Sequence, residues 1–566
     1  MGGALKTVII GGVAGGASAA ARLRRLDEQA EIILFERGAH ISYANCGLPY
    51  YVGQVIQDED SLYVQTPSAM KSRFNIDVRT NSEVIAIDRA GKTVLVKKLE
   101  SGREYTETYD KLILSPGAEP FIPSGVDINL PGVFTFHNIR DGLALRRFID
   151  EQKVNNAVIV GGGFIGIELA ENLYHRKIEV TLIEGADQVL APFDYDMAAI
   201  IQNHLRQNKI QLITQTVVTH VEQVENGQAR ILSVHMNNGQ TLEADMIVLG
   251  IGIRPKSELA EKAGLKLGER KGIWVNEFQQ TSDPDIYAAG DGAETFDMNS
   301  KERVMLALAG PANRQGRLAA DNIGGQASPF QGVAGTAILK VFDKAAACTG
   351  YNEKQLKRLG NPYEKVFVYP LSHAGYYPGG TQMALKLLFA PDTGAILGGQ
   401  AIGKEGVDKA IDLIAAAYQF GGTVNQLAQL ELAYAPPFSS AKAPVNVAGF
   451  VAGNVLNRES RILHWHDVGN LIDEDWTILD VRTRAEYNEG HIEGAELIPL
   501  DELRKNLHRL DNRKRILIYC RVGLRGYLGE RILCQNGFNE VYNLSGGYQL
   551  YAEVEKNKKA VIKQPS

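Results

Sequence analysis

The sequence has few cysteines and no long apolar run. Four of its 566 residues are cysteine, too few for a disulfide scaffold in a chain of this length. They form no CxxC pair, and no His/Cys cluster has metal-ligand spacing, so we predict no metal site. No apolar stretch approaches the roughly 18 residues needed to span a bilayer. These absences favour a soluble protein of a reducing cytoplasm.

The sequence also has no large excess of positive or negative charge. The net charge is −6, with 45% hydrophobic and 22% charged residues, as in ordinary globular proteins. This balance gives no reason to expect nucleic acid or an anionic membrane as partner. A local basic cluster of Arg22, Arg24 and Arg25 can still hold a small anionic ligand. The first residues have neither the apolar stretch of a signal peptide nor, with Lys6, a myristoylation pattern.

What the sequence does contain is a dinucleotide-binding pattern near its start. Residues 7–10 predict a buried parallel strand, and a small-residue helix follows from Ala17. The glycines between them allow a tight turn and let backbone amides approach a pyrophosphate. The next strand, 32–35, ends at Glu36, which is placed to accept hydrogen bonds from a ribose. The turn consists of Gly11, Gly12, Val13, Ala14, Gly15 and Gly16, and Val13 departs from the strict glycine pattern.

The same pattern returns in stricter form. Strand 157–160 leads into Gly161, Gly163 and Gly166, and strand 180–183 ends at Glu184. A carboxylate there would bond the free 2′-hydroxyl of NAD and repel the phosphate of NADP, and no arginine follows closely, so NADH is favoured. A lone fingerprint can be only a glycine-rich turn in an α/β sheet; two complete units make that reading much weaker.

Two further segments complete a family pattern. Residues 111–118 run from a strand into Ser115-Pro116-Gly117, and residues 281–291 end at Asp291. In order and spacing these four pieces resemble the pyridine nucleotide-disulfide oxidoreductases, flavoproteins with two dinucleotide-binding domains, over residues 5 to about 450. The resemblance implies NAD on the second module and FAD on the first. The FAD positions that it implies are the first glycine turn, Glu36, Arg37, Ser115, Pro116, Gly117 and Asp291.

Cys46 occupies the place of that family's redox cysteine. Many members carry a CxxxxC disulfide, but here Tyr51 stands where the second cysteine would be. A one-cysteine site cannot cycle through an intramolecular disulfide, so its oxidised form must be a mixed disulfide, a persulfide or a sulfenic acid. Cys348 and Cys534, in contrast, lie in apolar segments and are interpreted as structural.

The surroundings of Cys46 resemble the coenzyme A-disulfide reductase branch, whose cysteine motif is shared with NADH oxidases and peroxidases. The resemblance implies that Tyr434 faces the cysteine of a partner subunit as an acid, with Tyr376 or Tyr377 as a weaker second candidate. It also implies a homodimer. The residues that it implies for coenzyme A are Ser18, Arg22, Arg25, Ser42, Asn45, Asn313 and Lys442. The helix arginines can equally be solvated, and the tyrosine pair can be a packed turn.

A second reactive cysteine follows a predicted strand near the end of the chain. Residues 515–519 deliver Cys520 to the carboxyl edge of a parallel sheet, where ligands bind. With the segments around residues 480–500, this pattern resembles a rhodanese domain. Arg525 follows Cys520 by five positions, one fewer than in related phosphatases, so the loop fits a sulfur atom better than phosphate. Successive backbone amides and Arg525 would surround the sulfur and lower the thiol pKa; Arg521 attracts an anionic donor or is simply solvated.

We therefore predict an α/β fold with four domains. They are an FAD-binding domain (1–115 and 276–329), an NAD-binding domain (116–275), an α+β dimerisation domain (330–450) and, after a linker (451–461), an α/β rhodanese domain (462–566).

The predicted activity is NADH-driven, FAD-dependent reduction of coenzyme A persulfide, polysulfides and coenzyme A disulfide. Cys46 forms the mixed disulfide, hydrosulfide leaves, and Cys520 carries sulfane sulfur. Three alternatives stay open: an NADH oxidase or peroxidase cycling through Cys46 sulfenic acid, a thiosulfate sulfurtransferase, and a rhodanese that only binds a sulfur-carrying partner.

Overall fold

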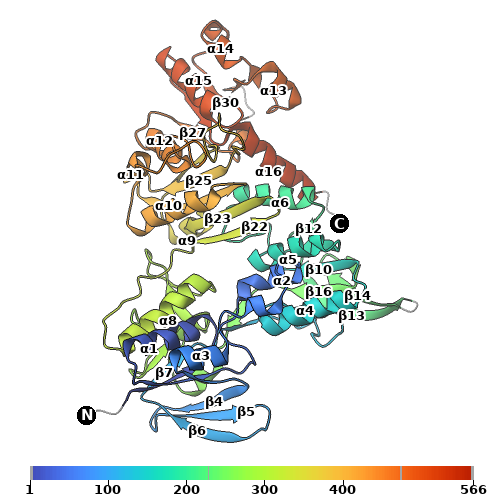
Figure 1. Cartoon of the computed structure of the whole chain (residues 1–566). Coiled ribbons are helices and arrows are strands. Elements are labelled where there is room, and N and C mark those ends of the chain that lie inside the picture. The colour runs from blue at the N-terminus through green and yellow to red at the C-terminus, as the bar shows by residue number, and fades with distance from the viewer. Residues whose placement is uncertain (1–3, 227–228, 472–474, 563–566) are drawn as a thin grey trace. The chain divides into compact units, whose positions relative to one another are not determined.

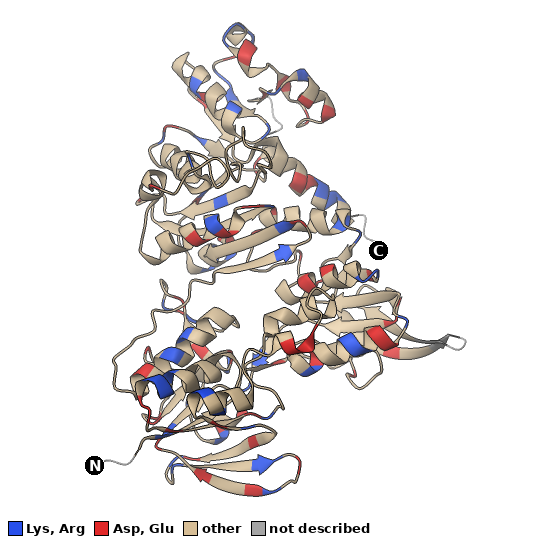
Figure 2. Ribbon diagram, in the orientation of Figure 1, with Lys and Arg blue, Asp and Glu red and all other residues tan. Residues whose placement is uncertain are grey.

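The computed structural model describes residues 4–226, 229–471 and 475–562. The chain divides into two compact units, Met1–Ile183 with Val217–Val333 and Glu184–Thr216 with Ala334–Ser566. Parallel sheets flanked by helices occur in both, which confirms the α/β fold class (Figure 1). Acidic and basic residues are intermixed along the ribbon (Figure 2). Every described helix is too short or too polar to cross a lipid bilayer.

The first unit contains the first predicted nucleotide module. Its five-stranded sheet has the order β19-β7-β1-β2-β3, and every neighbouring pair is parallel. Helices α1 and α8 pack together on one face, and the small antiparallel sheet β4-β5-β6 covers the other (Figure 1). Both faces are thus covered, which is why β1, β2 and β7 are mostly apolar runs in the sequence. The bounds are β1 Lys6–Ile10, α1 Ala14–Leu26, β2 Glu31–Phe35, β3 Asp77–Arg79, β4 Ser82–Asp88, β5 Thr93–Lys98, β6 Glu104–Thr108, β7 Lys111–Leu114, β19 Ile286–Ala288 and α8 Ala309–Ile323.

The second nucleotide module repeats this arrangement. Strands β11, β10, β16 and β9 lie side by side and parallel, and the predicted helix through Glu168 is α5. An antiparallel sheet, β13-β14-β15, belongs to the same unit. The bounds are β9 Val133–Thr135, α4 Ile139–Glu151, β10 Asn156–Val160, α5 Phe164–His175, β11 Glu179–Ile183, β13 Val218–Asn226, β14 Ala229–Met236, β15 Thr241–Ala244 and β16 Met246–Leu249.

The second unit contains an antiparallel sheet in the order β22-β23-β26-β25-β24. Helix α10 packs on β23 and β26, and α12 packs on β24 and β25. Helix α12 continues beyond residue 450, across the predicted start of the linker. The bounds are β22 Ala337–Val341, β23 Lys344–Gly350, α9 Glu353–Leu359, β24 Glu364–Val368, β25 Ala384–Phe389, β26 Ile396–Gly403, α10 Val407–Gln419, α11 Val424–Gln429 and α12 Pro444–Leu456.

The same unit ends with a parallel sheet in the order β27-β31-β30-β28-β29. Strand β30 leads into Cys520, as predicted. The last helix of the unit, α16, lies against α6, which comes from the earlier segment of the same unit, Glu184–Thr216 (Figure 1). The bounds are α6 Tyr195–Gln207, β27 Ile462–Leu463, β28 Trp476–Asp480, α13 Arg484–Glu489, β29 Glu496–Leu497, α14 Leu500–Leu503, β30 Arg515–Tyr519, α15 Leu524–Gln535, β31 Val541–Leu544 and α16 Gly547–Ile562.

Candidate redox and sulfur-binding sites

Cys46 lies in a short 3-10 turn directly before helix α2, Leu48–Val52. All four cysteines are free, and Cys46 is the exposed one. The loop before it is fixed to the first glycine turn, because the Ser42 amide donates to the Gly12 carbonyl at 2.8 Å. Ser42 has a φ of 44°, a left-handed conformation that is uncommon for serine. The chain thus bends sharply to bring Cys46 to the nucleotide turn.

Helix α2 is held by the second nucleotide module. The Tyr50 hydroxyl donates to Glu168 at 3.1 Å, and the Arg176 guanidinium donates to the Val52 carbonyl at 3.0 Å. A Cβ on Gly53 would lie 2.1 Å from the Asn172 side chain, so α2 sits in close contact with α5. Cys46, at the start of α2, is therefore positioned by both modules of this unit.

Two carboxylates shape the electrostatics around Cys46. Although the residue is exposed, partial burial of its sulfur raises the pKa of the Cys46 thiol, and the negative charges of Glu168 and Asp291 raise it further. Burial also raises the pKa of Glu168 to about 7, against the hydrogen bond from Tyr50. The sequence predicts a helix through Glu168 but no role for its carboxylate, because no local pattern shows that this side chain faces Cys46, which lies far earlier in the chain.

Replacing Glu168 with glutamine is expected to make Cys46 more reactive. Loss of the nearby negative charge lowers the thiol pKa, so more thiolate is present at pH 7.5. We expect iodoacetamide to alkylate Cys46 about two to three times faster, measured on the Cys46 peptide by mass spectrometry. Glu151→Gln, at an exposed position of α4, is the matched control. An unchanged alkylation rate in Glu168→Gln would contradict the assigned charge effect.

The first glycine turn has the shape that a dinucleotide needs. Gly11 has a φ of 96°, and a Cβ there would lie 2.0 Å from the Ser115 carbonyl. A Cβ on Gly16 would lie 1.9 Å from the Gly11 carbonyl. Val13 is the residue before α1, so its departure from glycine leaves the helix start intact. Glu36 directly follows β2, and its carboxylate accepts hydrogen bonds from the Gly12 and Gly38 amides at 2.9 and 2.7 Å.

The other residues predicted to contact FAD surround this turn. The Ser115 amide donates to the Ile10 carbonyl at 2.7 Å. Pro116 follows it, and a Cβ on Gly117 would meet no atom within 4 Å, so space is open beside this turn. Arg37 is mostly exposed and lies 3.6 Å from Glu83.

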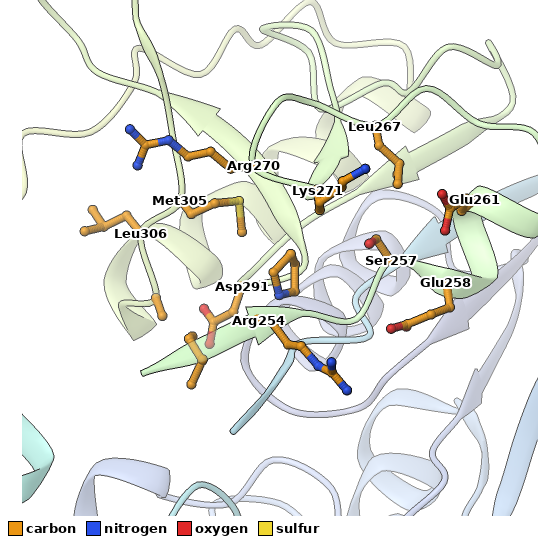
Figure 3. Close-up of a pocket in the computed structure, with 13 residues that line it drawn as sticks. Arg254, Ser257, Glu258, Glu261, Leu267, Arg270, Lys271, Asp291, Met305 and Leu306 are labelled. Atoms are coloured by element: carbon orange, nitrogen blue, oxygen red, sulfur yellow. The ribbon is translucent and has the colours of Figure 1, made fainter. Parts of the chain in front are cut away.

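Asp291 is the residue that best indicates whether this site can hold FAD. Its carboxylate makes no hydrogen bond with the described residues, and burial raises its pKa to about 6. It lines a cavity of about 600 Å³ together with Arg254, Ser257 and Met305 (Figure 3). A half-buried acceptor without a partner among the described residues fits a hydroxyl-rich ligand, as the ribityl chain of FAD is.

The second glycine turn also has the shape that a dinucleotide such as NAD needs. A Cβ on Gly161 would lie 2.4 Å from the Gly250 carbonyl, and one on Gly166 would lie 2.0 Å from the Gly161 carbonyl. At Gly163 a Cβ would meet nothing within 4 Å, so the protein leaves this space open for a close ligand. Glu184 follows β11 in the chain, and its carboxylate accepts from the Ala186 amide at 2.8 Å.

The residues predicted to bind coenzyme A are partly brought together. The Ser18 hydroxyl on α1 donates to Asn313 on α8, and the Arg22 guanidinium pairs with Asp321 of the same helix. Arg25 and Asn45 are exposed, and Ser42 is half-buried; Lys442, in the second unit, is also exposed.

Arg24 corrects the predicted basic cluster. It is 5% exposed and donates to five backbone carbonyls, those of Asp27, Glu28, Ala30, Phe74 and Asn75. A guanidinium satisfied in this way joins the end of α1 to the following loops and cannot bind a ligand anion.

The two candidate acid tyrosines meet in the second unit. The Tyr376 and Tyr434 hydroxyls are 2.7 Å apart, and Tyr377 instead packs edge-on against His373. Tyr376 and Phe438 are 76% and 74% exposed. An exposed aromatic patch of this kind is typical of a surface that another protein chain covers.

Cys520 is buried at the end of β30, at the start of the loop that leads to α15. Its sulfur accepts the Gly523 amide at 3.2 Å, and the residue is 1% exposed. Gly547 must be glycine, since a Cβ there would lie 2.6 Å from the Cys520 carbonyl. The Asn543 amide donates to the Gly523 carbonyl at 3.2 Å and so supports the loop from β31. Sequence analysis missed Asn543, for which no local signal exists.

Arg525 does not surround the sulfur as simply as predicted. Its guanidinium donates to both oxygens of Glu486, at 2.8 and 2.6 Å. Its pKa is raised by that bond first, with a smaller contribution from Cys520. Arg521 is exposed and donates to Gln549 at 3.2 Å. The sequence predicts that the positive charge of Arg525 acts on the Cys520 sulfur. In the structure, the Glu486 carboxylate of α13 shares that positive charge.

The remaining cysteines have structural surroundings. Cys348 is 4% exposed within β23, and burial raises its pKa to about 12. Cys534 is half-buried on α15, and burial raises its pKa as well. Both side chains pack among apolar residues, as a structural role requires.

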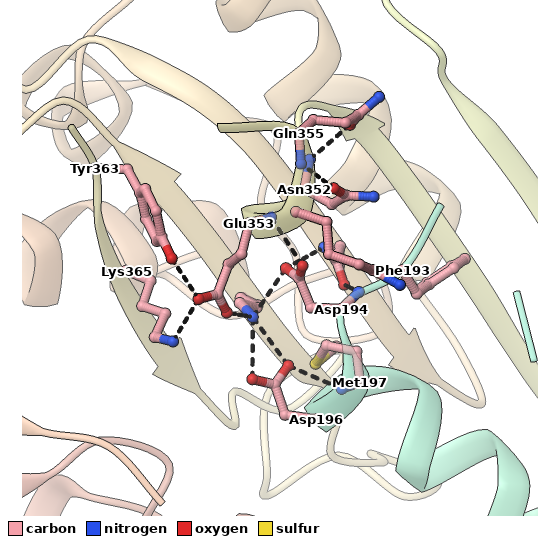
Figure 4. Close-up of polar contacts among 12 residues, drawn as sticks. Phe193, Asp194, Asp196, Met197, Asn352, Glu353, Gln355, Tyr363 and Lys365 are labelled. Atoms are coloured by element: carbon pink, nitrogen blue, oxygen red, sulfur yellow. Dashed lines mark hydrogen bonds and ion pairs between the residues drawn. The ribbon is translucent and has the colours of Figure 1, made fainter. Parts of the chain in front are cut away.

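The second unit also contains a buried ionic cluster around Lys386 (Figure 4). The Lys386 ammonium lies 2.9 Å from both Asp194 and Asp196 and also bonds Glu353. These three carboxylates could by geometry hold a metal ion, but they surround the ammonium instead. The Trp465 indole donates to Asp196 at 3.2 Å, so α6, the antiparallel sheet and the start of the predicted rhodanese domain meet here.

Protein-family comparisons match three segments of the chain. Residues 5–316 match the pyridine nucleotide-disulphide oxidoreductase model, and residues 336–444 match the dimerisation domain of the same proteins. Residues 465–553 match the rhodanese-like domain.

Individual proteins are similar over most of the chain. A coenzyme A disulfide reductase of Staphylococcus aureus is 35% identical over 448 residues, which are 79% of this chain and 99% of that protein. The crystal structure of reduced Bacillus anthracis CoADR-RHD is 47% identical, with a TM-score of 0.95 and coverage of 98% of this chain and 99% of that chain. An NAD-dependent persulfide reductase from A. fulgidus is 37% identical, with a TM-score of 0.90 and coverage of 97% and 100%.

Proposed function

Because this chain belongs to the pyridine nucleotide-disulphide oxidoreductase family, we propose that it is an NADH-driven, FAD-dependent reductase of coenzyme A persulfide and related sulfur–sulfur bonds. Polysulfides and coenzyme A disulfide are further substrates. The observation that carries the proposal is Cys46, an exposed lone thiol held between the two nucleotide modules, on a chain that also holds a buried Cys520 under the Gly523 amide. The similar coenzyme A disulfide and persulfide reductases support it.

In this proposal the Cys46 thiolate attacks the sulfur that is bonded to the coenzyme A carbon chain. The sulfur–sulfur bond breaks, hydrosulfide leaves, and a Cys46–coenzyme A mixed disulfide forms. When bound, FAD would supply the two electrons of NADH. Cys46 would then leave the mixed disulfide as a thiolate, and coenzyme A, taking up one proton, would leave as a thiol. Ser18, Arg22, Arg25, Ser42, Asn45 and Asn313 would hold coenzyme A, with Lys442.

Tyr434 and Tyr376 are proposed as the acid pair of a homodimer, reaching Cys46 of the partner copy. Their hydroxyl–hydroxyl bond supports Tyr376 over Tyr377. Replacing either Tyr434 or Tyr376 with phenylalanine removes the proton donor, and we expect coenzyme A release in single turnover to slow about 100-fold. Tyr377→Phe is the matched control and should turn over normally. Equal rates in all three variants would exclude the acid role.

The test of the proposed function is anaerobic turnover of the full-length protein with NADH. We expect stoichiometric hydrosulfide from coenzyme A persulfide, and a Cys46–coenzyme A adduct by mass spectrometry when NADH is withheld. Turnover with oxygen or peroxide and a sulfenic acid on Cys46, without any coenzyme A adduct, would instead support the oxidase reading.

A further inference from the structure

The carboxylate that meets Arg525 is itself fixed in place. Glu486 lies in the first turn of α13, where its side chain accepts from the Thr483 amide and hydroxyl at 3.0 Å each. The Thr483 hydroxyl in turn accepts the Glu486 amide, which completes a capping box. Glu486 is thus oriented by its own helix, and Arg525 is oriented by Glu486.

This pair removes one positive charge from the neighbourhood of Cys520. The hydrogen bond from Arg525 holds the pKa of Glu486 at about 2, so both groups are ionised at neutral pH and their charges cancel. The pair is only partly exposed, 33% for the Arg525 side chain and 25% for Glu486, so water screens it incompletely. Arg521 and Arg484 are exposed, where solvent weakens their influence on the buried sulfur.

A sulfur donor must leave water to reach Cys520, and desolvation costs more for a dianion than for a singly charged group. We propose that Glu486 sets the donor specificity of Cys520, disfavouring doubly charged thiosulfate and favouring persulfide donors whose reacting end carries at most one charge. Glu486 acts as a positioning residue, through Arg525. This inference rests on the proposed role of Cys520 as sulfur acceptor.

The transfer step is the same for both donors. The Cys520 thiolate attacks the outer sulfur and becomes a cysteine persulfide, while the donor's sulfur–sulfur bond breaks. Thiosulfate then leaves as sulfite, and glutathione persulfide leaves as glutathione thiolate. Cyanide takes the outer sulfur as thiocyanate and restores the thiolate, so no external oxidant or reductant is required.

The experiment compares thiocyanate formation from thiosulfate and from glutathione persulfide in full-length, FAD-loaded protein. Glu486→Gln keeps a residue that can complete the capping box and removes only the charge. We expect it to raise the thiosulfate-to-persulfide ratio of kcat/KM about tenfold, since Arg525 then presents an uncompensated charge to the dianion. Glu489→Gln, at an exposed position of the same helix, should leave the ratio unchanged.

The double variant Glu486→Gln with Arg525→Gln should return the ratio to the wild-type value, because the effect is transmitted by Arg525. An unchanged ratio in Glu486→Gln, with both rates altered equally and normal thermal unfolding, would overturn the inference and leave Glu486 a structural residue. If wild-type protein forms no thiocyanate from either donor, the role of Cys520 itself fails, which is a separate outcome.

Discussion

Cys46→Ser protein is expected to release hydrosulfide from coenzyme A persulfide at least about 1,000-fold more slowly than wild type, because serine cannot form the mixed disulfide. Reduction of bound flavin by NADH should stay rapid, since Gly161, Gly163 and Gly166 are unchanged. Stopped-flow absorbance follows the flavin, and a hydrosulfide assay follows the product. The two signals separate loss of the thiol from loss of the nucleotide sites.

Two matched variants sharpen this result. Cys534→Ser removes a half-buried thiol on α15 and should behave as wild type. Cys520→Ser should keep reduction of coenzyme A persulfide and lose transfer to cyanide. Hydrosulfide release retained in Cys46→Ser and lost in Cys520→Ser would refute the proposed mechanism and favour a sulfurtransferase that uses the flavin half only for product reduction.

Lys386→Met is expected to destabilise the second unit by about 3–5 kcal/mol, the range for breaking a buried ion pair from one side. Lys386 is fully buried, and the carboxylates raise its pKa against the effect of burial. Burial alone would raise the pKa of Glu353, but Lys386 and Lys365 hold it well below its usual range. Without the ammonium, three buried carboxylates face one another, and Lys365 lies 2.7 Å from Glu353.

Calorimetry and hydrogen exchange of full-length protein would measure this loss, because a multidomain chain does not unfold in one step. The variant should also regain stability on acidification. Carboxylates without their cation have folded-state pKa values above the unfolded ones, so their penalty grows as pH rises through the unfolded values near 4. Lys404→Met breaks an exposed pair with Asp343, at 2.7 Å, and should cost no more than about 1 kcal/mol. Equal stability of the two variants would show that the cluster is not stabilising.

Contacts between the predicted rhodanese domain and the rest of the second unit affect how that domain should be tested. Trp465 bonds Asp196, Asn203 on α6 donates to Glu553 on α16, and Phe367 donates its amide to Ser545 at 3.1 Å. Deleting the residues beyond 460 would uncover these groups and confound activity with folding. Point substitution of Cys520 leaves the contacts in place and is the cleaner experiment.

The local patterns of the sequence were enough to predict both nucleotide turns, the strands that lead into them, Cys46 in its loop and Cys520 at the end of β30. Each depends on a short run of residues whose backbone geometry permits few alternatives, such as Gly11 and Gly161 with their positive φ angles. That information is contiguous in the chain, so it can be read without a structure.

Tertiary structure alone decided which charged and polar side chains lie beside one another. Glu168 reaches Tyr50 across 118 positions, Glu486 reaches Arg525 across 39, and Lys386 reaches Asp196 across 190. These pairings depend on how helices and sheets pack, and no local propensity encodes which charged side chain will be buried beside which. The sequence by itself therefore determined that one chain carries two cysteines in loops of different kinds; the packing decided which charges surround each sulfur.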